Sequence, residues 1–160
     1  MKIIALLVIT IVLGYIIFMT NSNDVKLEKA TLGAGCFWGV EKDLSEIKGV
    51  KSTVVGYMGG TTENPTYEEV SSGNTGHTEV VQIEFDPLEV SYKEILLRFW
   101  SIHDSSKESK RQYRSVIFYH NDEQRRIAEE LKRSKSSLTS IEHVQAFWKA
   151  EDYHQKYFLK

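Results

Sequence analysis

A strand, a glycine-rich turn and a helix follow one another in residues 27–49, LEKATLGAGCFWGVEKDLSEIKG. The strand is predicted at Leu27–Leu32, and the Gly-Ala-Gly run at 33–35 ends it. The helix is predicted from about Cys36, because apolar side chains then recur at helical spacing before a Lys-Gly stop signal, at Val40, Leu44 and Ile47. Cys36 is therefore expected where a strand ends and a helix begins.

Further elements are predicted toward the C-terminus. Strands are predicted where β-branched or alternating apolar residues gather, at Val50–Tyr57, Thr78–Phe85, Ser115–Tyr119 and His143–Trp148. Capping boxes at Thr66 and Ser91 predict a short and a longer helix, and a third helix is predicted at Asn121–Lys132 with Asn121 as its cap.

The order of the first six main elements predicts the fold class. That order is β-α-β-β-α-β, which is typical of a split βαβ, ferredoxin-like arrangement. We therefore expect an α+β, two-layer ferredoxin-like sandwich, with the last helix and strand as C-terminal additions.

Length and composition limit the possible functions. The 160 residues carry 20 Lys+Arg against 22 Asp+Glu, so the formal net charge is −2 and there is no electrostatic footprint for nucleic acid. One cysteine excludes an internal disulfide, a cysteine-based zinc site and a Cys-x-x-Cys redox pair. The five histidines lack metal-ligand spacing, so we expect no metal site. We expect no bound cofactor either.

The N-terminal segment differs from the rest because Ile3–Met19 carries no charge. A helix of that length rises ~25 Å, close to the thickness of a bilayer core, and no amphipathic face is visible. The alternatives are a buried core helix, a cleaved signal peptide and an uncleaved signal-anchor. Because no Ala-x-Ala cleavage site follows, we expect residues 1–23 to anchor one domain, residues 24–160, outside the cytoplasm. Cleavage would instead make the domain a secreted one.

Cys36 is the first candidate functional residue. It stands in Gly35-Cys36-Phe37-Trp38-Gly39, at a predicted helix start, where free amides and the helix dipole favour a thiolate. Thiolate is the nucleophilic form, and the flanking glycines allow close approach of a substrate. The alternative is a buried, inert cysteine. We interpret Cys36 as a nucleophile.

Glu79 is the second candidate functional residue. Side chains alternate along the predicted strand Thr78–Phe85, which places Glu79 on its more apolar face. Desolvation there would raise the pKa of Glu79 and make it a proton donor near neutral pH, whereas a strand-end glutamate could instead turn into solvent. Tyr67 and Tyr113 are candidate hydrogen-bond donors, although either could serve only for packing.

Six short motifs occur in one order along the chain. They are GCFWG at 35–39, GYMGG at 56–60, YEEV at 67–70, GHTEV at 76–80, QYRS at 112–115 and AEDYHQ at 150–155. From about Lys29 to Phe158 the chain closely resembles the peptide methionine sulfoxide reductase A (methionine-S-sulfoxide reductase) family. Six ordered motifs make the resemblance specific, whereas any one of them alone is weak.

The resemblance implies a reaction and roles for the four candidates. The family reduces the S epimer of methionine sulfoxide, free or in peptides and proteins, to methionine. Cys36 would attack the sulfoxide sulfur, and Glu79 would protonate the departing oxygen. Tyr67 and Tyr113 would donate hydrogen bonds to that oxygen as charge develops on it.

A substrate pocket and an external reductant are also implied by the resemblance. Phe37 and Trp38 would form an apolar pocket for the S-methyl group of the substrate. Cys36 would be left as a sulfenic acid, which many relatives resolve with cysteines of a C-terminal extension. Because this sequence has no second cysteine, we expect an external thiol, either a small thiol or a reduced thioredoxin-like protein. We also expect the enzyme to be a monomer.

One departure from the family leaves alternatives open. Relatives usually have a Gly-Asn-Asp loop before the QYRS motif, whereas residues 105–113 of this shortened connection contain no aspartate. A related thiol enzyme of different specificity, or a weakened domain that binds methionine-rich partners at the membrane, would also fit. The intact set of Cys36, Glu79, Tyr67 and Tyr113 favours the reductase.

Overall fold

The computed structural model describes residues 25–160. The predicted anchor, residues 1–23, lies outside the described residues. Within the described part of the chain, no helix is both long enough and apolar enough to cross a membrane.

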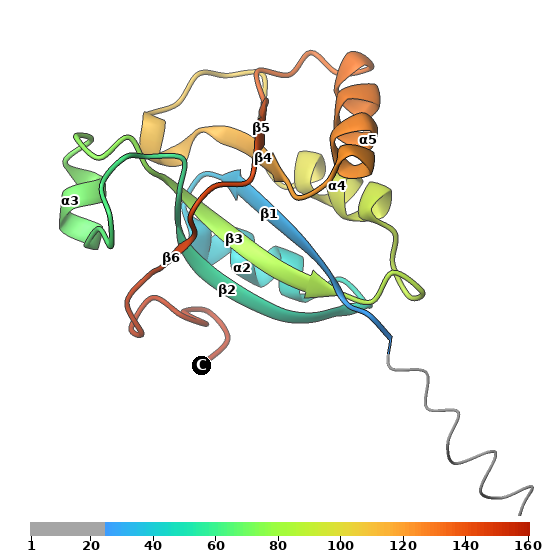
Figure 1. Ribbon diagram of the computed structural model, residues 1–160, viewed down its shortest axis with the longest axis horizontal. Helices are drawn as coiled ribbons and strands as arrows, with labels where there is room; N and C mark the ends of the chain where they lie inside the picture. Colours follow the sequence, from blue (N-terminus) through green and yellow to red (C-terminus); the bar gives the residue numbers. More distant parts are fainter. Residues whose placement is uncertain (1–24) are drawn as a thin grey trace, which may run out of the picture.

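A mixed six-stranded sheet forms the centre of the domain (Figure 1). Its strands are β1 (Glu28–Ala34), β2 (Val50–Met58), β3 (Thr78–Phe85), β4 (Ser115–Tyr119), β5 (Ser140–His143) and β6 (Trp148–Lys149). They lie in the order β5-β4-β1-β3-β2-β6. All neighbouring strands in this order pair antiparallel except β4 and β5, which pair parallel. The chain therefore enters β1 and β3 at opposite ends of the sheet.

Four α-helices and one 3-10 turn connect the strands of the described chain. They are α2 (Phe37–Ser45), α3 (Tyr67–Ser71), α4 (Tyr92–Ser101), η1 (Arg111–Tyr113) and α5 (Asp122–Arg133). Both predicted capping boxes are present, with Thr66 and Ser91 each accepting a bond from the amide three residues on. Asn121 caps α5 in the predicted way. Helices α2 and α4 lie behind the sheet in Figure 1.

The hydrophobic core lies between the sheet and the helices. Its buried residues come from β1, β2, β3 and β4 on one side and from α2, α4 and α5 on the other. A smaller cluster occupies the opposite face of the sheet, formed by Met58, Val80, Val116 and Phe118 with Val144 and Phe147. Gly56 permits this cover, because a Cβ there would lie 2.5 Å from the Phe147 ring.

The predicted α+β class is confirmed, and the strands Thr78–Phe85 and Ser115–Tyr119 have the predicted bounds. The predicted last strand, His143–Trp148, is wrong. Strand β5 ends at its first residue and β6 begins at its last, while the residues between them cover the second face of the sheet. The apolar pattern there reflects burial against the sheet rather than membership of it.

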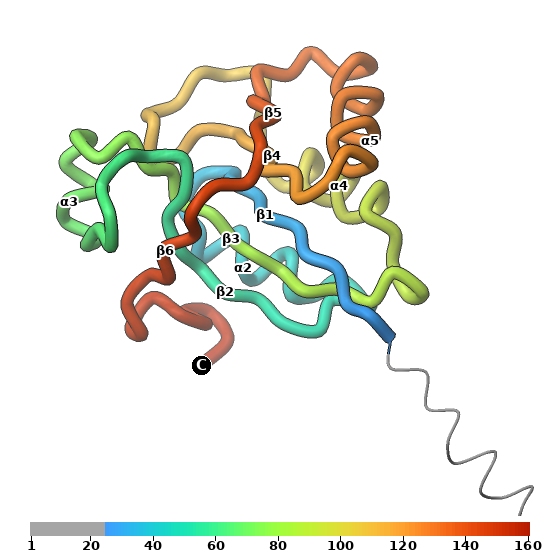
Figure 2. The backbone as a smooth tube through the Cα atoms, viewed as in Figure 1, coloured from blue at the N-terminus to red at the C-terminus, as the bar shows by residue number. Residues whose placement is uncertain are grey.

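The C-terminal segment, residues 150–160, returns along β2 (Figure 2). The side chain of Gln155 accepts a hydrogen bond from the Val55 amide and donates one to the Val55 carbonyl, both at 3.0 Å, in the manner of a neighbouring strand. Lys156 donates to the buried carboxylate of Glu41 in α2 at 2.9 Å. These contacts place the aromatic residues of the segment beside the start of α2.

Candidate active site

Cys36 is the N-cap residue of α2 and is separated from the end of β1 by one residue, so it lies between a strand and a helix as predicted. Gly35 before it has φ +97°, a left-handed conformation that favours glycine. Although the cysteine is exposed, crowding by protein atoms desolvates the thiol and raises its pKa, and the charge of Glu79 adds to this increase. The amides of Trp38 and Gly39 act in the opposite direction but do not prevail. The helix start thus favours the thiolate as expected, and the net increase in the pKa of Cys36 comes from desolvation and from Glu79.

Glu79 is buried, with 1% of its surface exposed, on the face of β3 that meets the core. The alternative of a solvent-exposed glutamate is thus wrong. One carboxyl oxygen, Oε2, accepts from the Phe37 amide at 3.0 Å, and the other, Oε1, accepts from Nε2 of Gln112 at 2.8 Å. Burial raises the pKa of Glu79, and the two hydrogen bonds oppose this shift. Since both partners donate, a proton on Glu79 is free to be donated elsewhere.

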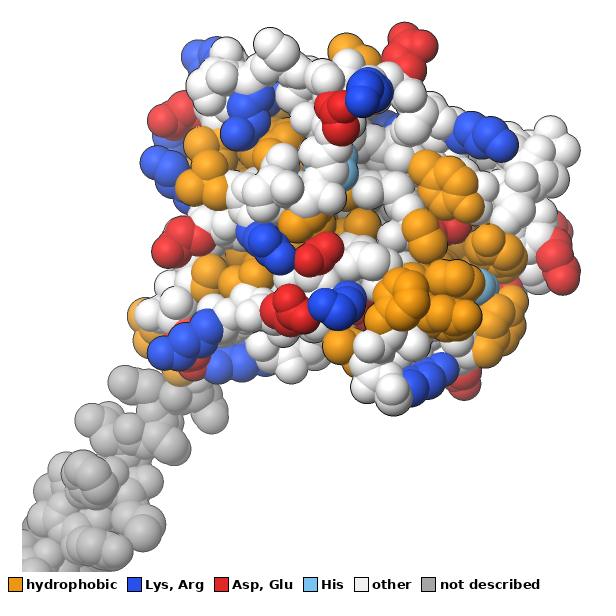
Figure 3. All heavy atoms as spheres, turned by 180° about the vertical axis from the view of Figure 1, so that it is seen from behind, with side chains coloured by type: hydrophobic (Ala, Val, Ile, Leu, Met, Phe, Trp, Pro, Cys, Tyr) orange, Lys and Arg blue, Asp and Glu red, His pale blue; other side chains and the backbone are white. Residues whose placement is uncertain are grey.

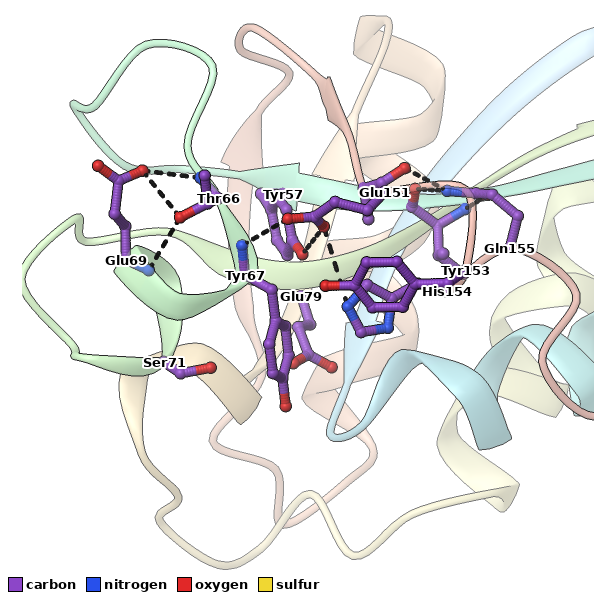
Figure 4. A network of polar contacts seen from close by, with 12 residues as sticks. Tyr57, Thr66, Tyr67, Glu69, Ser71, Glu79, Glu151, Tyr153, His154 and Gln155 are labelled. Atoms are coloured by element: carbon purple, nitrogen blue, oxygen red, sulfur yellow. Dashed lines mark hydrogen bonds and ion pairs between the residues drawn. The ribbon is translucent and has the colours of Figure 1, made fainter.

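Tyr67 and Tyr113 reach the same end of the sheet from two different elements. Tyr67 is the first residue of α3, and Tyr113 is the last residue of η1. Burial raises the pKa of Tyr113 to about 12, with further contributions from Glu79, Tyr67 and Cys36. Tyr113 therefore lies within electrostatic reach of the other three candidates. Figure 4 shows the side chains of Tyr67 and Glu79 pointing in a common direction.

Phe37 and Trp38 provide an apolar wall next to Cys36. Phe37 is buried, with its ring centroid 5.2 Å from that of His154. Trp38 is half-buried, and its ring stacks on Tyr157 at a centroid distance of 3.8 Å. Its indole Nε1 donates to Nδ1 of His154 at 3.0 Å. Figure 3 shows hydrophobic side chains gathered on the side of the molecule where the C-terminal segment lies.

Sequence reasoning assigned no role to Glu151 and His154, which support this site (Figure 4). Glu151 accepts from the hydroxyl of Tyr57 at 2.9 Å and from the amide of Tyr67 at 2.8 Å, so it fixes the start of α3. His154 is buried, and this burial lowers its pKa and favours the neutral imidazole that accepts from Trp38. The only available signal was their place in the AEDYHQ motif.

Gln112 is the third contact that sequence reasoning missed. It is buried in η1 next to Tyr113 and donates to Glu79, yet it lies 33 residues from that glutamate in the sequence. No periodicity connects the two positions. Its place in the QYRS motif was the only hint.

The assembled groups suit attack on an electrophile that carries an oxygen atom. A thiol can act as nucleophile, a buried carboxyl can deliver a proton, and two phenols can stabilise developing negative charge on oxygen. Within residues 25–160, no group of three or more His, Cys, Asp or Glu side chains is placed to hold a metal ion.

Comparison with known proteins agrees with this chemistry. Residues 28–160 match the sequence profile of the family described as "Peptide methionine sulfoxide reductase". The chain is 52% identical to peptide methionine sulfoxide reductase MsrA of Methanothermobacter thermautotrophicus, over 84% of this chain and 88% of that protein.

Solved structures are similar as well. Reduced Mxr1 from Saccharomyces cerevisiae matches with a TM-score of 0.76 and 30% identity, over 85% of this chain and 86% of that one. Mxr1 in complex with Trx2 matches with a TM-score of 0.58 and 25% identity, over 84% and 87% of the two chains. The chain therefore belongs to the peptide methionine sulfoxide reductase family and is an oxidoreductase that reduces methionine sulfoxide.

Proposed function

We propose that this protein acts on the S epimer of methionine sulfoxide, free or in peptides and proteins, with Cys36 as nucleophile and Glu79 as proton donor. The observation that carries this proposal is the geometry of Glu79. It is buried beside the helix start that carries Cys36, and both of its hydrogen bonds are donated to it. Its own proton can therefore go to the oxygen of a bound sulfoxide.

The reduction step balances with these two groups. The Cys36 thiolate attacks the sulfur of the sulfoxide while the Glu79 carboxyl gives its proton to the sulfoxide oxygen. The attack forms a bond between the two sulfur atoms. The protonated oxygen then passes from the substrate sulfur to the Cys36 sulfur while the sulfur–sulfur bond breaks, which leaves a sulfenic acid on Cys36. The substrate leaves as a thioether, so methionine is reduced and Cys36 is oxidised by two electrons.

Tyr67 and Tyr113 stabilise the oxygen in this proposal. Negative charge grows on the oxygen before the proton is transferred, and phenol donors that are already in place stabilise it at little reorganisation cost. The raised pKa of Tyr113 keeps that phenol protonated and able to donate at neutral pH. Phe37 and Trp38 provide the apolar surface for the S-methyl group, and His154 holds the Trp38 indole in place.

An external thiol completes the cycle in this proposal, as in a single-cysteine form of the family. Cys36 is exposed and is the one cysteine of the 160-residue sequence. A thiol attacks the sulfenic acid and water leaves, and a second thiol then attacks the mixed disulfide and releases the Cys36 thiol. A small thiol or a thioredoxin-like protein can fill this role. The complex of Mxr1 with Trx2 supports a protein reductant.

The test uses the full chain, purified in detergent, with dithiothreitol and a peptide that carries either epimer of methionine sulfoxide. We expect turnover of the S epimer, no turnover of the R epimer, and loss of turnover in Cys36→Ser. A sulfenic acid trapped by dimedone on Cys36 after one turnover supports the intermediate. Full activity of Cys36→Ser would refute the role of the cysteine.

We also propose the finer points of architecture and location. The β4-β1-β3-β2 order of antiparallel strands, with α2 and α4 as crossovers, supports the ferredoxin-like assignment. The uncharged run Ile3–Met19 supports a membrane anchor that places a monomeric domain outside the cytoplasm. N-terminal sequencing of the mature protein tests the anchor, because a start near Asn23 would show cleavage.

A further inference from the structure

Gln112 holds one oxygen of the Glu79 carboxyl, and the start of α2 holds the other. Its Nε2 atom donates to Oε1 of Glu79 at 2.8 Å, and both groups are buried. The Phe37 amide holds the other oxygen at 3.0 Å. With one donor on each oxygen, the carboxyl cannot rotate about its terminal bond without breaking a hydrogen bond.

The backbone that carries Gln112 is itself tied down. Arg111 donates to the carbonyl oxygens of Gly76 and Gly59, both at 2.9 Å. The hydroxyl of Thr78 donates to the Arg111 carbonyl at 3.0 Å. The turn η1 is therefore attached to the loop before β3 and to the end of β2, so the position of the Gln112 amide is well defined.

Gln112 also connects the elements that carry the two phenols. It directly precedes Tyr113 in η1. Its Nε2 lies 3.3 Å from the hydroxyl oxygen of Ser71, which is the last residue of the helix that begins with Tyr67. One buried amide thus touches Glu79 and joins the supports of both tyrosines.

We propose that Gln112 is a positioning residue that orients the Glu79 carboxyl for proton transfer and sets its readiness to give up the proton. This inference rests on the proposed role of Glu79 as proton donor. A donor on Oε1 leaves the remaining lone pairs and the proton of Glu79 directed away from Gln112 and from the Phe37 amide. The same donor stabilises the carboxylate that remains after the proton has left.

The electrostatic consequence has a definite sign. Burial raises the pKa of Glu79, and the Gln112 hydrogen bond opposes that increase because it favours the ionised form. Loss of the donor should raise the pKa of Glu79 further, by about one unit for a hydrogen bond to a charged group, which corresponds to about 1.4 kcal/mol.

The first measurement is a carboxyl ¹³C NMR titration of the full chain in the Cys36→Ser background, with Glu79 assigned through Glu79→Gln. Gln112→Met keeps the length of the side chain but removes the donor. Gln112→Asn keeps an amide, but the shorter side chain cannot reach the Glu79 carboxyl. This variant replaces Gln112→Met in the titration if the methionine variant does not fold. Both should raise the pKa of Glu79 by about one unit.

Gln124→Met is the matched control for this titration. Gln124 is also a buried glutamine that donates through Nε2, but its acceptor is the Lys29 carbonyl at the opposite end of β1. The control should leave the Glu79 titration unchanged, which separates the effect of the Gln112 donor from the general effect of losing a buried amide.

The second measurement is the pH dependence of kcat/KM with the cysteine in place. The reactive form combines a Cys36 thiolate with a protonated Glu79, so kcat/KM rises with pH through the lower of the two pKa values. Because carboxyl groups titrate far below thiols, that limb belongs to Glu79 and should move to higher pH in Gln112→Met. Misorientation should also lower kcat about 10- to 100-fold, with KM nearly unchanged.

The outcomes separate this inference from the function on which it rests. An unchanged Glu79 titration in folded Gln112→Met and Gln112→Asn would overturn the role of Gln112. Full activity of Glu79→Gln would instead remove the proton-donor role. The titration would then still show whether Gln112 acts on Glu79.

Discussion

The substitution Glu79→Gln replaces the buried carboxyl by an amide of nearly the same shape. The amide oxygen can keep the bond from the Phe37 amide, which is 3.0 Å long in the native protein. The new NH₂ group then faces the NH₂ of Gln112, so Gln112 has to turn its own oxygen toward position 79. That turn also reverses the long 3.3 Å contact with Ser71, whose hydroxyl can then donate to the Gln112 oxygen. The structural cost should therefore be less than about 1 kcal/mol.

The catalytic cost of Glu79→Gln should be much larger. An amide cannot deliver a proton, and general acid catalysis contributes about 10²- to 10⁴-fold to a rate. At 1.36 kcal/mol for each factor of ten, this is about 2.7 to 5.4 kcal/mol of transition-state stabilisation. We therefore expect a 10²- to 10⁴-fold loss of kcat in a protein that remains folded.

Glu79→Gln should also change the pH dependence of stability. Burial raises the pKa of folded Glu79 above its unfolded value, which is about 4.3. Stability contributed by the protonated group is fully present below the unfolded pKa and is lost as pH rises through the folded pKa. An amide does not titrate, so Glu79→Gln should not lose this stability. The stability of the variant relative to the native protein should therefore increase as the pH rises from acid to mildly alkaline values.

The assay combines turnover of the S-sulfoxide peptide with urea unfolding at pH 5 and pH 8. Glu84→Gln is the control, because Glu84 lies on the same strand but is only half-buried and pairs with Lys29 and Ser52 near the surface. It should leave kcat within about twofold of the native value, since surface substitutions away from the site have small effects. Native-like turnover by Glu79→Gln would refute the reasoning, as would a smaller relative stability of the variant at pH 8 than at pH 5.

Three further perturbations follow from the same geometry. The rate of Cys36 alkylation by iodoacetamide should rise with pH, with a midpoint above the ordinary thiol pKa of about 8.5. Glu79→Gln should lower that midpoint, because a neighbouring negative charge is gone. A midpoint below about pH 8 in the native protein would contradict the structure. Lys156→Met leaves the buried Glu41 carboxylate with fewer donors and should cost about 2–3 kcal/mol, or about 6–12 °C in Tm by calorimetry. Lys149→Met breaks only a surface pair with Asp152 and should change stability by less than about 0.5 kcal/mol, so equal losses in the two lysine variants would disprove the buried pair. Tyr157→Ala removes the ring stacked on Trp38 and should raise KM about 3- to 10-fold with a smaller change in kcat, whereas an unchanged KM would show that this stacking does not contribute to substrate binding.

Local patterns were sufficient for most of the secondary structure. The capping boxes at Thr66 and Ser91 involve residues three positions apart, so the chain needs no distant partner to start those helices. Alternation along Thr78–Phe85 likewise predicted that Glu79 faces the core, because a strand that buries one face also buries the glutamate on it.

The error at His143–Trp148 has a tertiary cause. Strand β5 pairs with β4, and β6 pairs with β2, on opposite edges of the sheet. The apolar residues between β5 and β6 pack over the second face instead of continuing either strand. An apolar run has the same appearance in both situations, so only the positions of its partners distinguish them.

The nucleophile and the acid were identifiable from short motifs, because a cysteine at a glycine-flanked helix start and a glutamate on an apolar strand face are local features. Their environment was not. The Trp38–His154 bond joins residues 116 positions apart, and the Gln112–Glu79 bond joins residues 33 positions apart. The pKa of Cys36 depends on its desolvation and on the charge of Glu79, which outweigh the helix amides only once the chain has folded. The sequence was thus enough to identify the reacting groups, whereas their proton affinities and supports depend on contacts that exist only in the tertiary structure.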